Sequence, residues 1–155
     1  ALLIPRVYIT KVLGLYDSLW GLIIPMCVSV FDVFLLRQFF LTLPRELEEA
    51  AMIDGASRLR IFIQIILPLS RPALAVVTIT SFIWHWNDLI WPLVIINTPS
   101  RYTLPLALAL LTGGQSHKPQ LTMAGAAIAT IPILIVFLVF QKRILKGIAL
   151  TGLKV

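Results

Sequence analysis

Long apolar runs dominate the chain and predict membrane-spanning helices. Such a helix needs about 20 mostly apolar residues to cross a hydrocarbon core about 30 Å thick. Three runs are long enough, at residues 19–40, 72–96 and 121–140, and the last carries no charge. We therefore expect an all-α chain that divides into the tail of an earlier span with a turn at 1–14, a span at 15–40, a loop at 41–69, a span at 70–97, a loop at 98–119, a span at 120–141 and a tail at 142–155.

Composition supports lipid as the surrounding solvent. Of the 155 residues, 59% are hydrophobic and 13% charged, against about 45–50% and about 25% in an average soluble domain. The net charge of +6 is spread between apolar runs, which favours membrane orientation over nucleic-acid binding. Cys27 is the single cysteine, so an internal disulfide and a cysteine-based zinc site are excluded. The chain opens on ALLIP without a methionine, so we expect it to lack its N-terminal part.

The basic residues predict an orientation. Nine of the 13 lie in or beside the 41–69 loop and in the C-terminal tail: Arg37, Arg45, Arg58, Arg60, Arg71, Lys142, Arg143, Lys146 and Lys154. The other four, Arg6, Lys11, Arg101 and Lys118, fall on the opposite side. Because Lys and Arg are enriched on the cytoplasmic side, we expect the 41–69 loop and the C-terminus to be cytoplasmic, and the 98–119 loop to be external.

The 41–69 loop carries helix signals of its own. Pro44 can take the first position of a helix, and Gly55 can end it in a left-handed conformation. Ser57 can cap a second short helix that ends before Pro68. The pattern predicts two short helices joined at residues 54–56. The first has three glutamates against one arginine, so docking to a cytoplasmic partner is modestly favoured over lying on anionic lipid.

The same loop carries a family resemblance. EEAAMIDGAS (residues 48–57) followed by LPLSRP (residues 67–72) resembles the EAA loop of ABC-importer permeases. The flanking blocks FLLRQFF, LPREL, WHWNDLIWPL, RYTLPL and QKRILKGIALTGLK resemble the carbohydrate branch, in order and spacing. The likeness covers essentially the whole chain and is to the C-terminal portion of the smaller permease of maltose-type sugar importers.

The resemblance implies a fold, partners and site residues. The fold would be a polytopic transmembrane helix bundle of the MetI-like permease type with short cytoplasmic coupling helices, in a bacterial or archaeal inner membrane. The partners would be two ATP-binding subunits, a second permease subunit and an extracytoplasmic solute-binding protein, with a sugar as substrate. The coupling motif maps onto Glu49, Ala50, Ala51, Asp54, Gly55 and Ala56, which would contact an ATP-binding subunit.

Polar residues in the 70–97 span form a second candidate site. On a continuous helix Trp84, Asp88 and Trp91 would share one face that includes Ser81, with residues 85 and 92 nearby, and Asn87 is a further polar candidate in the same run. Polar groups inside a membrane tend to face a water-filled path or to bond neighbouring helices. For Asn87 and Asp88 both interpretations stay open, and for His85 we favour the second. We expect Asp17, in the turn before the first whole span, to cap a helix.

No motif predicts chemistry in this chain. The sequence lacks a GxxxxGK[ST] phosphate loop, HExxH, CxxC and GxSxG, so we expect no catalytic residue, metal or cofactor and no enzyme activity. Alternative functions are a secondary transporter or channel that uses Asp88 or Asp32, a membrane anchor for a cytoplasmic enzyme, and an ABC permease for a solute other than a sugar. The apolar stretch 104–111 of the external loop predicts an interfacial helix or a contact with the solute-binding protein.

Overall fold

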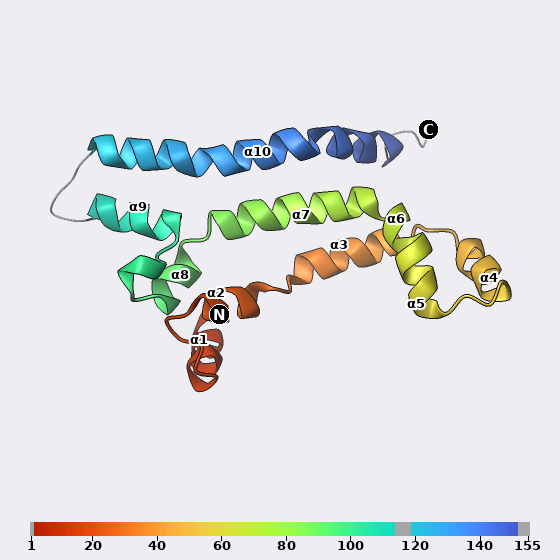
Figure 1. The fold of residues 1–155 in the computed structure, drawn as a ribbon, viewed down its shortest axis with the longest axis horizontal. Coiled ribbons are helices and arrows are strands. Elements are labelled where there is room, and N and C mark those ends of the chain that lie inside the picture. The colour runs from red at the N-terminus through yellow and green to blue at the C-terminus, as the bar shows by residue number, and fades with distance from the viewer. Residues whose placement is uncertain (1, 114–118, 152–155) are drawn as a thin grey trace. The chain divides into compact units, whose positions relative to one another are not determined.

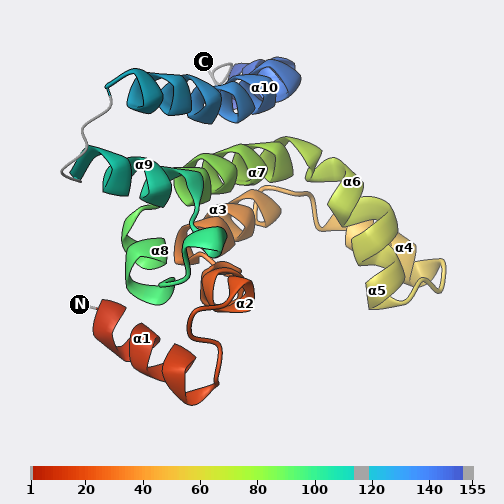
Figure 2. The same cartoon turned by 60° about the vertical axis from the view of Figure 1, so that its left-hand side comes forward.

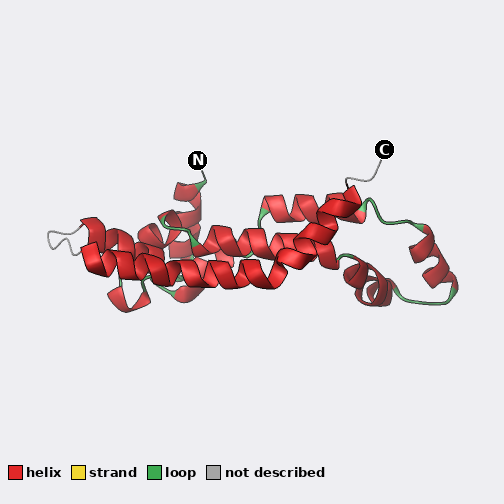
Figure 3. Cartoon of the chain, turned by 90° about the horizontal axis from the view of Figure 1, so that it is seen from above, coloured by secondary structure: helices red, strands yellow, loops and turns green. Residues whose placement is uncertain are grey.

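Helices make up the regular structure of the chain. The computed structural model describes residues 2–113 and 119–151, with side chains as far as residue 141, and these ranges contain no strand (Figures 1 and 3). The all-α prediction is confirmed. Lys118 and the adjoining part of the external loop, together with the last four residues of the predicted tail, lie outside the described residues.

The chain divides into two compact units, residues 1–29 with 82–136 and residues 30–81 with 137–155. The first unit contains α1 (Leu3–Val12), α2 (Leu19–Ile23), the 3-10 turn η1 (Ile24–Met26), α8 (Ile90–Ile95), the 3-10 turn η3 (Pro99–Arg101) and α9 (Leu104–Gly113). The second contains α3 (Val30–Phe40), α4 (Glu46–Ile53), α5 (Arg58–Ile61), the π-helical turn η2 (Phe62–Ile66) and α6 (Leu67–Leu69). The helices α7 (Arg71–Trp86) and α10 (Pro119–Thr151) contribute to both.

The buried core of the first unit forms where α2 lies beside α8 (Figure 2). Trp91, Ile95 and Ile96 are at most 3% exposed. The partly buried side chains packed against them come from α1, α2, the turns and the loop after α8: Val7, Tyr16, Leu22, Met26 and Tyr102. Gly21 lies in tight contact here, because a Cβ added to it would be 2.1 Å from the carbonyl oxygen of Leu15. The small residue therefore permits the turn to approach α2.

The apolar run 19–40 is long and apolar enough to cross a membrane, but it is not one helix. The backbone is helical to Met26, irregular over residues 27–29 and helical again from Val30. Pro25 lies in the 3-10 turn before the break. Proline has no N–H to donate to the preceding turn, which explains why the helix loosens here.

The prediction of one continuous helix over residues 72–96 is wrong, because the structure divides this run into two helices. The structure ends α7 at Trp86, leaves residues 87–89 irregular, and restarts at Ile90 as α8. The 16 residues of α7 span about 24 Å, less than the hydrocarbon core of about 30 Å. The break lies at two polar residues of this run, Asn87 and Asp88.

The apolar surface of α10 is turned outward. Residues 119–141 are long and apolar enough to cross a membrane, and no residue of their most apolar stretch is buried within the chain. Burial against lipid or against other helices would remove this surface from water. Close packing with α9 occurs at Gly125, where an added Cβ would lie 2.4 Å from the Leu108 side chain. The predicted helix at 104–111 is confirmed as α9.

Candidate functional site

The hairpin α4–turn–α5 contains all six residues of the predicted coupling motif (Figure 1). Two short helices joined at residues 54–56 are confirmed. Gly55 has a φ of +77°, and its N–H donates to the carbonyl of Met52 at 3.0 Å. The N–H of Ala56 donates to the carbonyl of Ala51 at 3.0 Å, so the two bonds close the C-terminus of α4.

Local signals placed the second helix correctly at its start but not at its end. The Ser57 hydroxyl accepts from the N–H of Arg60 at 3.4 Å, which confirms the cap. The expected end before Pro68 is wrong, because helical structure continues through η2 and α6 to Leu69. In the π turn the N–H of Leu67 donates to the carbonyl of Phe62, five residues back, and this wider turn accommodates the following proline. Pro44 is also not the first helical residue, since α4 begins at Glu46.

The surface of α4 is exposed in this chain. No residue of α4 is buried, and Ile53 is 87% exposed. Among the six motif residues, Glu49, Ala50, Asp54 and Gly55 are exposed, while Ala51 and Ala56 are half-buried. Asp54 lies at the C-terminal cap of α4, where the negative end of the helix dipole disfavours a carboxylate. Its position is therefore not explained by the stability of α4.

An open groove of about 500 Å³ lies on the inner side of the hairpin. Its lining is apolar except for one acidic and one basic side chain: Phe40, Leu43, Glu48, Met52, Arg58, Ile61, Phe62 and Ile66. The groove is lined by α4, α5 and the end of α3, whereas Ala50, Ile53 and the turn residues Asp54 and Gly55 are exposed and lie outside its lining. We conclude that the hairpin is shaped as a projection.

The helix face expected from Trp84, Asp88 and Trp91 does not form, because the helix breaks at residues 87–89. Asn87 Nδ2 donates to the carbonyl of Ile83 at 2.8 Å and thereby satisfies the end of α7. The N–H groups of Ile90 and Trp91 donate to Asp88 Oδ1 at 3.1 and 3.4 Å, so Asp88 caps the start of α8. Asn87 and Asp88 satisfy helix ends that a continuous helix would not have, and this is the physical reason for the break.

The two tryptophans of that group have opposite surroundings. Trp84 is 77% exposed, whereas Trp91 is 2% exposed and donates its ring N–H to the carbonyl of Gly21 at 3.2 Å. The Arg6 guanidinium lies 5.6 Å from the centroid of the Trp91 ring. A third residue, Trp86, was not singled out from the sequence, yet its ring N–H donates to the carbonyl of Ala129 at 3.0 Å, and its ring stacks on Phe82.

Three polar residues do meet around a cavity in the first unit. The cavity is open, measures about 380 Å³ and is lined by His85, Asp88 and Thr103 together with six less polar residues: Leu22, Ile23, Met26, Cys27, Trp91 and Pro92. His85 Nε2 lies 3.1 Å from the carbonyl of Met26, which agrees with the interpretation of His85 as a contact between helices. Thr103 could not have been found from the sequence, because no pattern marks it.

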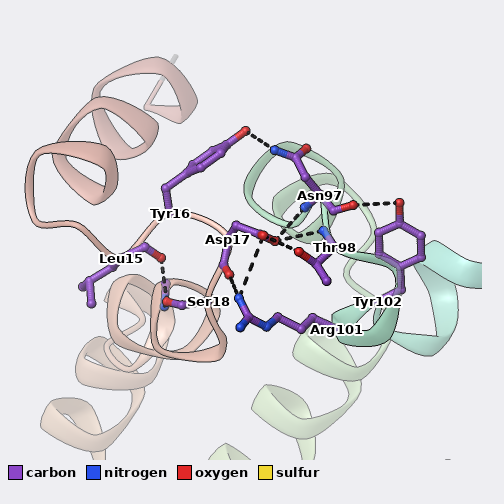
Figure 4. Close-up of polar contacts among 9 residues, drawn as sticks. Leu15, Tyr16, Asp17, Ser18, Asn97, Thr98, Arg101 and Tyr102 are labelled. Carbon is purple, nitrogen blue, oxygen red and sulfur yellow. Dashed lines mark hydrogen bonds and ion pairs between the residues drawn. The ribbon is translucent and has the colours of Figure 1, made fainter.

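Asp17 is a polar centre that the sequence assigned to the wrong role (Figure 4). Ser18, not Asp17, caps α2 by accepting from the N–H of Gly21 at 3.0 Å. Asp17, at a φ of +53°, instead accepts from the N–H groups of Asn97 and Thr98 and from the Thr98 hydroxyl, at 2.9, 3.0 and 2.5 Å. Arg101 adds an ion pair at 3.9 Å and a hydrogen bond to the Asp17 carbonyl.

These contacts hold the carboxylate of Asp17 in its charged form. Hydrogen bonds from the Thr98 hydroxyl, and then from the N–H groups of Thr98 and Asn97, lower its pKa to about 2, with a smaller contribution from Arg101. The result is a fixed connection between the turn before α2 and the loop after α8.

In the described part of the second unit, the carboxylate of Asp32 bonds a neighbouring helix. The Ser81 hydroxyl of α7 donates to Asp32 Oδ2 of α3 at 2.6 Å. Nowhere in residues 2–113 and 119–141 do three potential metal-ligating side chains converge. The described geometry thus consists of a projecting hairpin, capped helix ends and bonds between helices.

Comparison with known proteins adds the family. A family model described as "Binding-protein-dependent transport system inner membrane component" matches residues 1–149. The chain is 35% identical over 153 residues to the arabinooligosaccharides transport system permease protein AraQ of Bacillus subtilis, which covers 99% of this chain and 54% of AraQ. It is 38% identical over 146 residues to the sn-glycerol-3-phosphate transport system permease protein UgpE of Shigella flexneri, covering 93% and 52%.

A solved structure supports the same assignment. The chain is similar to a chain in the crystal structure of a bacterial ABC transporter involved in the import of the acidic polysaccharide alginate, with a TM-score of 0.78 and 30% identity over 90% of this chain and 55% of the other. The chain spans about half the length of the curated relatives it matches. Its helices, its apolar surface and these similarities agree: the chain belongs to the family of inner-membrane components of binding-protein-dependent transport systems.

Proposed function

We propose that this chain acts as a permease subunit of an ABC transporter that imports a sugar or oligosaccharide. ATP would be hydrolysed in two separate ATP-binding subunits, and a second permease subunit and an extracytoplasmic solute-binding protein would complete the transporter. The observation that carries the proposal is the exposed α4–α5 hairpin, which holds the EAA-type sequence in a chain of this family. We place the hairpin and the C-terminus in the cytoplasm because the basic residues are concentrated there.

The hairpin has the properties of a coupling contact. Glu49 and Ala50 lie exposed on α4, and the left-handed Gly55 ends the helix without a side chain that would obstruct an approaching surface. The dipole of α4 does not stabilise the carboxylate of Asp54, so we propose that Asp54 forms an ion pair with a basic group on the ATP-binding subunit. A rigid projection held in a moving partner can transmit a change between two states, because its contacts differ in the two states.

We assign the solute-facing role to a smaller set of residues than the sequence suggested. Asp88 lines the 380 Å³ cavity while it caps α8, and it remains a candidate for the translocation path. Asn87 bonds its own helix, Trp91 belongs to the core, and Trp84 faces away from the chain's interior. The proposal of a sugar as substrate rests on the carbohydrate names of the relatives and not on the lining of this cavity. The substrate class varies among the relatives, since one of them is named for sn-glycerol-3-phosphate.

The proposal is tested with the complete transporter in proteoliposomes. Uptake of labelled oligosaccharides is measured with ATP inside, with ADP, and with an imposed ion gradient. We expect uptake with ATP alone, and loss of uptake in Asp54→Arg, while Asp54→Asn retains part of it. The helix dipole favours a cation at this position, so Asp54→Arg leaves α4 folded. Uptake driven by the ion gradient without ATP would contradict the proposal.

A further inference from the structure

A sharp bend separates the hairpin from helix α7. The helical segment Arg58–Leu69, which comprises α5, η2 and α6, meets Arg71–Trp86 at an angle of 74°. The junction is Ser70, whose backbone has a φ of −84° and a ψ of 4°. All of the residues around this junction belong to the second unit.

A proline lies two residues before Ser70 and another lies two residues after it. Pro68 and Pro72 have no N–H, so the carbonyl groups four residues before each of them lose their usual partner in the helix. The structure responds with the π turn before Pro68 and with the change of direction at Ser70. Two prolines four residues apart thus fix where the segment turns.

The Ser70 side chain closes the junction. Its hydroxyl donates to the carbonyl of Ile66 at 2.7 Å, and its N–H donates to the same carbonyl at 2.9 Å. Ser70 is 0% exposed even within this chain alone, and Ile66 and Ala73 beside it are 7% and 5% exposed. A serine hydroxyl that bonds the carbonyl four residues back favours a bend in a helix, and the burial of Ser70 leaves this bond little access to water.

We propose that Ser70 is a positioning residue for energy coupling. It sets the angle between the helical segment Arg58–Leu69, which follows the hairpin turn, and α7. The inference rests on the proposed function, in which the hairpin is moved by an ATP-binding subunit. With the angle fixed, displacement of α4 and α5 is passed to α7. Without the Ser70 hydroxyl bond, part of the displacement is absorbed at the junction, and ATP is hydrolysed without a matching movement of solute.

The test compares coupling, not activity alone. In proteoliposomes with the complete transporter, ATP hydrolysed per solute imported is measured for Ser70→Ala, Ser70→Thr and the matched control Thr78→Ala. Thr78 makes the same kind of bond, from its hydroxyl to the carbonyl four residues back at 2.7 Å, but it lies exposed in the middle of α7. We expect the ratio to rise about two- to tenfold in Ser70→Ala. Ser70→Thr should restore it in part, and Thr78→Ala should leave it unchanged.

A second measurement covers the case in which Ser70→Ala assembles but transports too little for a reliable ratio. Spin labels at the exposed positions Leu59 and Thr78, with Cys27 replaced, report the distance across the bend in the purified transporter. We expect a broader distance distribution for Ser70→Ala than for Ser70. An unchanged distribution, or an unchanged ATP-to-solute ratio, overturns the role of Ser70. Absence of ATP-driven uptake in the unsubstituted transporter refutes the proposed function instead, and the distance measurement then still tests the junction.

Discussion

Gly55 offers a graded test of the hairpin turn. At a φ of +77° a residue with a side chain costs about 1–2 kcal/mol, and no atom lies within 4 Å of an added Cβ. Gly55→Ala therefore introduces backbone strain without a clash and shifts the population of the closed turn about 5- to 30-fold. Gly55→Asn should cost less, because asparagine tolerates the left-handed region.

Gly55→Pro is the severe member of the series. Proline fixes φ near −65°, far from +77°, and removes the N–H that donates to Met52. We expect a cost of about 3 kcal/mol or more at the turn, which opens the hairpin while the rest of the chain stays folded. ATP-driven uptake in proteoliposomes, normalised to the amount of transporter, should fall in the order Gly, Asn, Ala, Pro.

A matched control separates the hairpin from general backbone strain. Gly14 has a φ of +68° and equally open surroundings, but it lies in the turn after α1. Gly14→Ala should therefore carry the same strain as Gly55→Ala and retain uptake. The reasoning is refuted if Gly55→Pro transports as well as the unsubstituted protein, or if Gly14→Ala loses as much uptake as Gly55→Ala.

Three further predictions concern the first unit. Gly21→Ala places a Cβ 2.1 Å from the Leu15 carbonyl oxygen and should destabilise the protein by about 1–3 kcal/mol, measured by thermal unfolding in detergent. Trp91→Phe removes the bond to the Gly21 carbonyl and should cost about 1 kcal/mol in the same assay, whereas the 77% exposed Trp84 should tolerate phenylalanine. The pKa of Asp17 falls from 3.8 to about 2, so its stabilising contribution is complete above pH 3.8 and is lost as the pH falls through 2; melting curves should show this loss, and Asp17→Asn should remove it.

Local signals were sufficient for the hairpin. Gly55 and Ser57 act on their own backbone neighbours within a few residues, and both were assigned correctly from the sequence. The end at Pro68 was not, because the π turn that accommodates this proline depends on the packing of Ile61 and Ile66 as much as on the sequence.

Distant partners could not be read from the sequence. Asp17 bonds Thr98, 81 positions away, so the local pattern showed only a carboxylate before a helix and suggested a cap. The break at residues 87–89 was hidden because the flanking residues remain apolar on both sides. The resulting separation of Trp84 from Trp91 removed the helix face on which the candidate path had been built.

Site-specific photo-crosslinking from the hairpin tests the central claim most directly. A photoreactive amino acid replaces Ala50 on the exposed surface of α4, and a matched probe replaces Ile128, which is 58% exposed on α10. In the assembled transporter in membranes, position 50 should crosslink to the ATP-binding subunit, with a yield that changes when ATP is added, and position 128 should not. An assembled transporter in which position 50 gives no crosslink to that subunit, or is labelled only from the external side, would contradict the account.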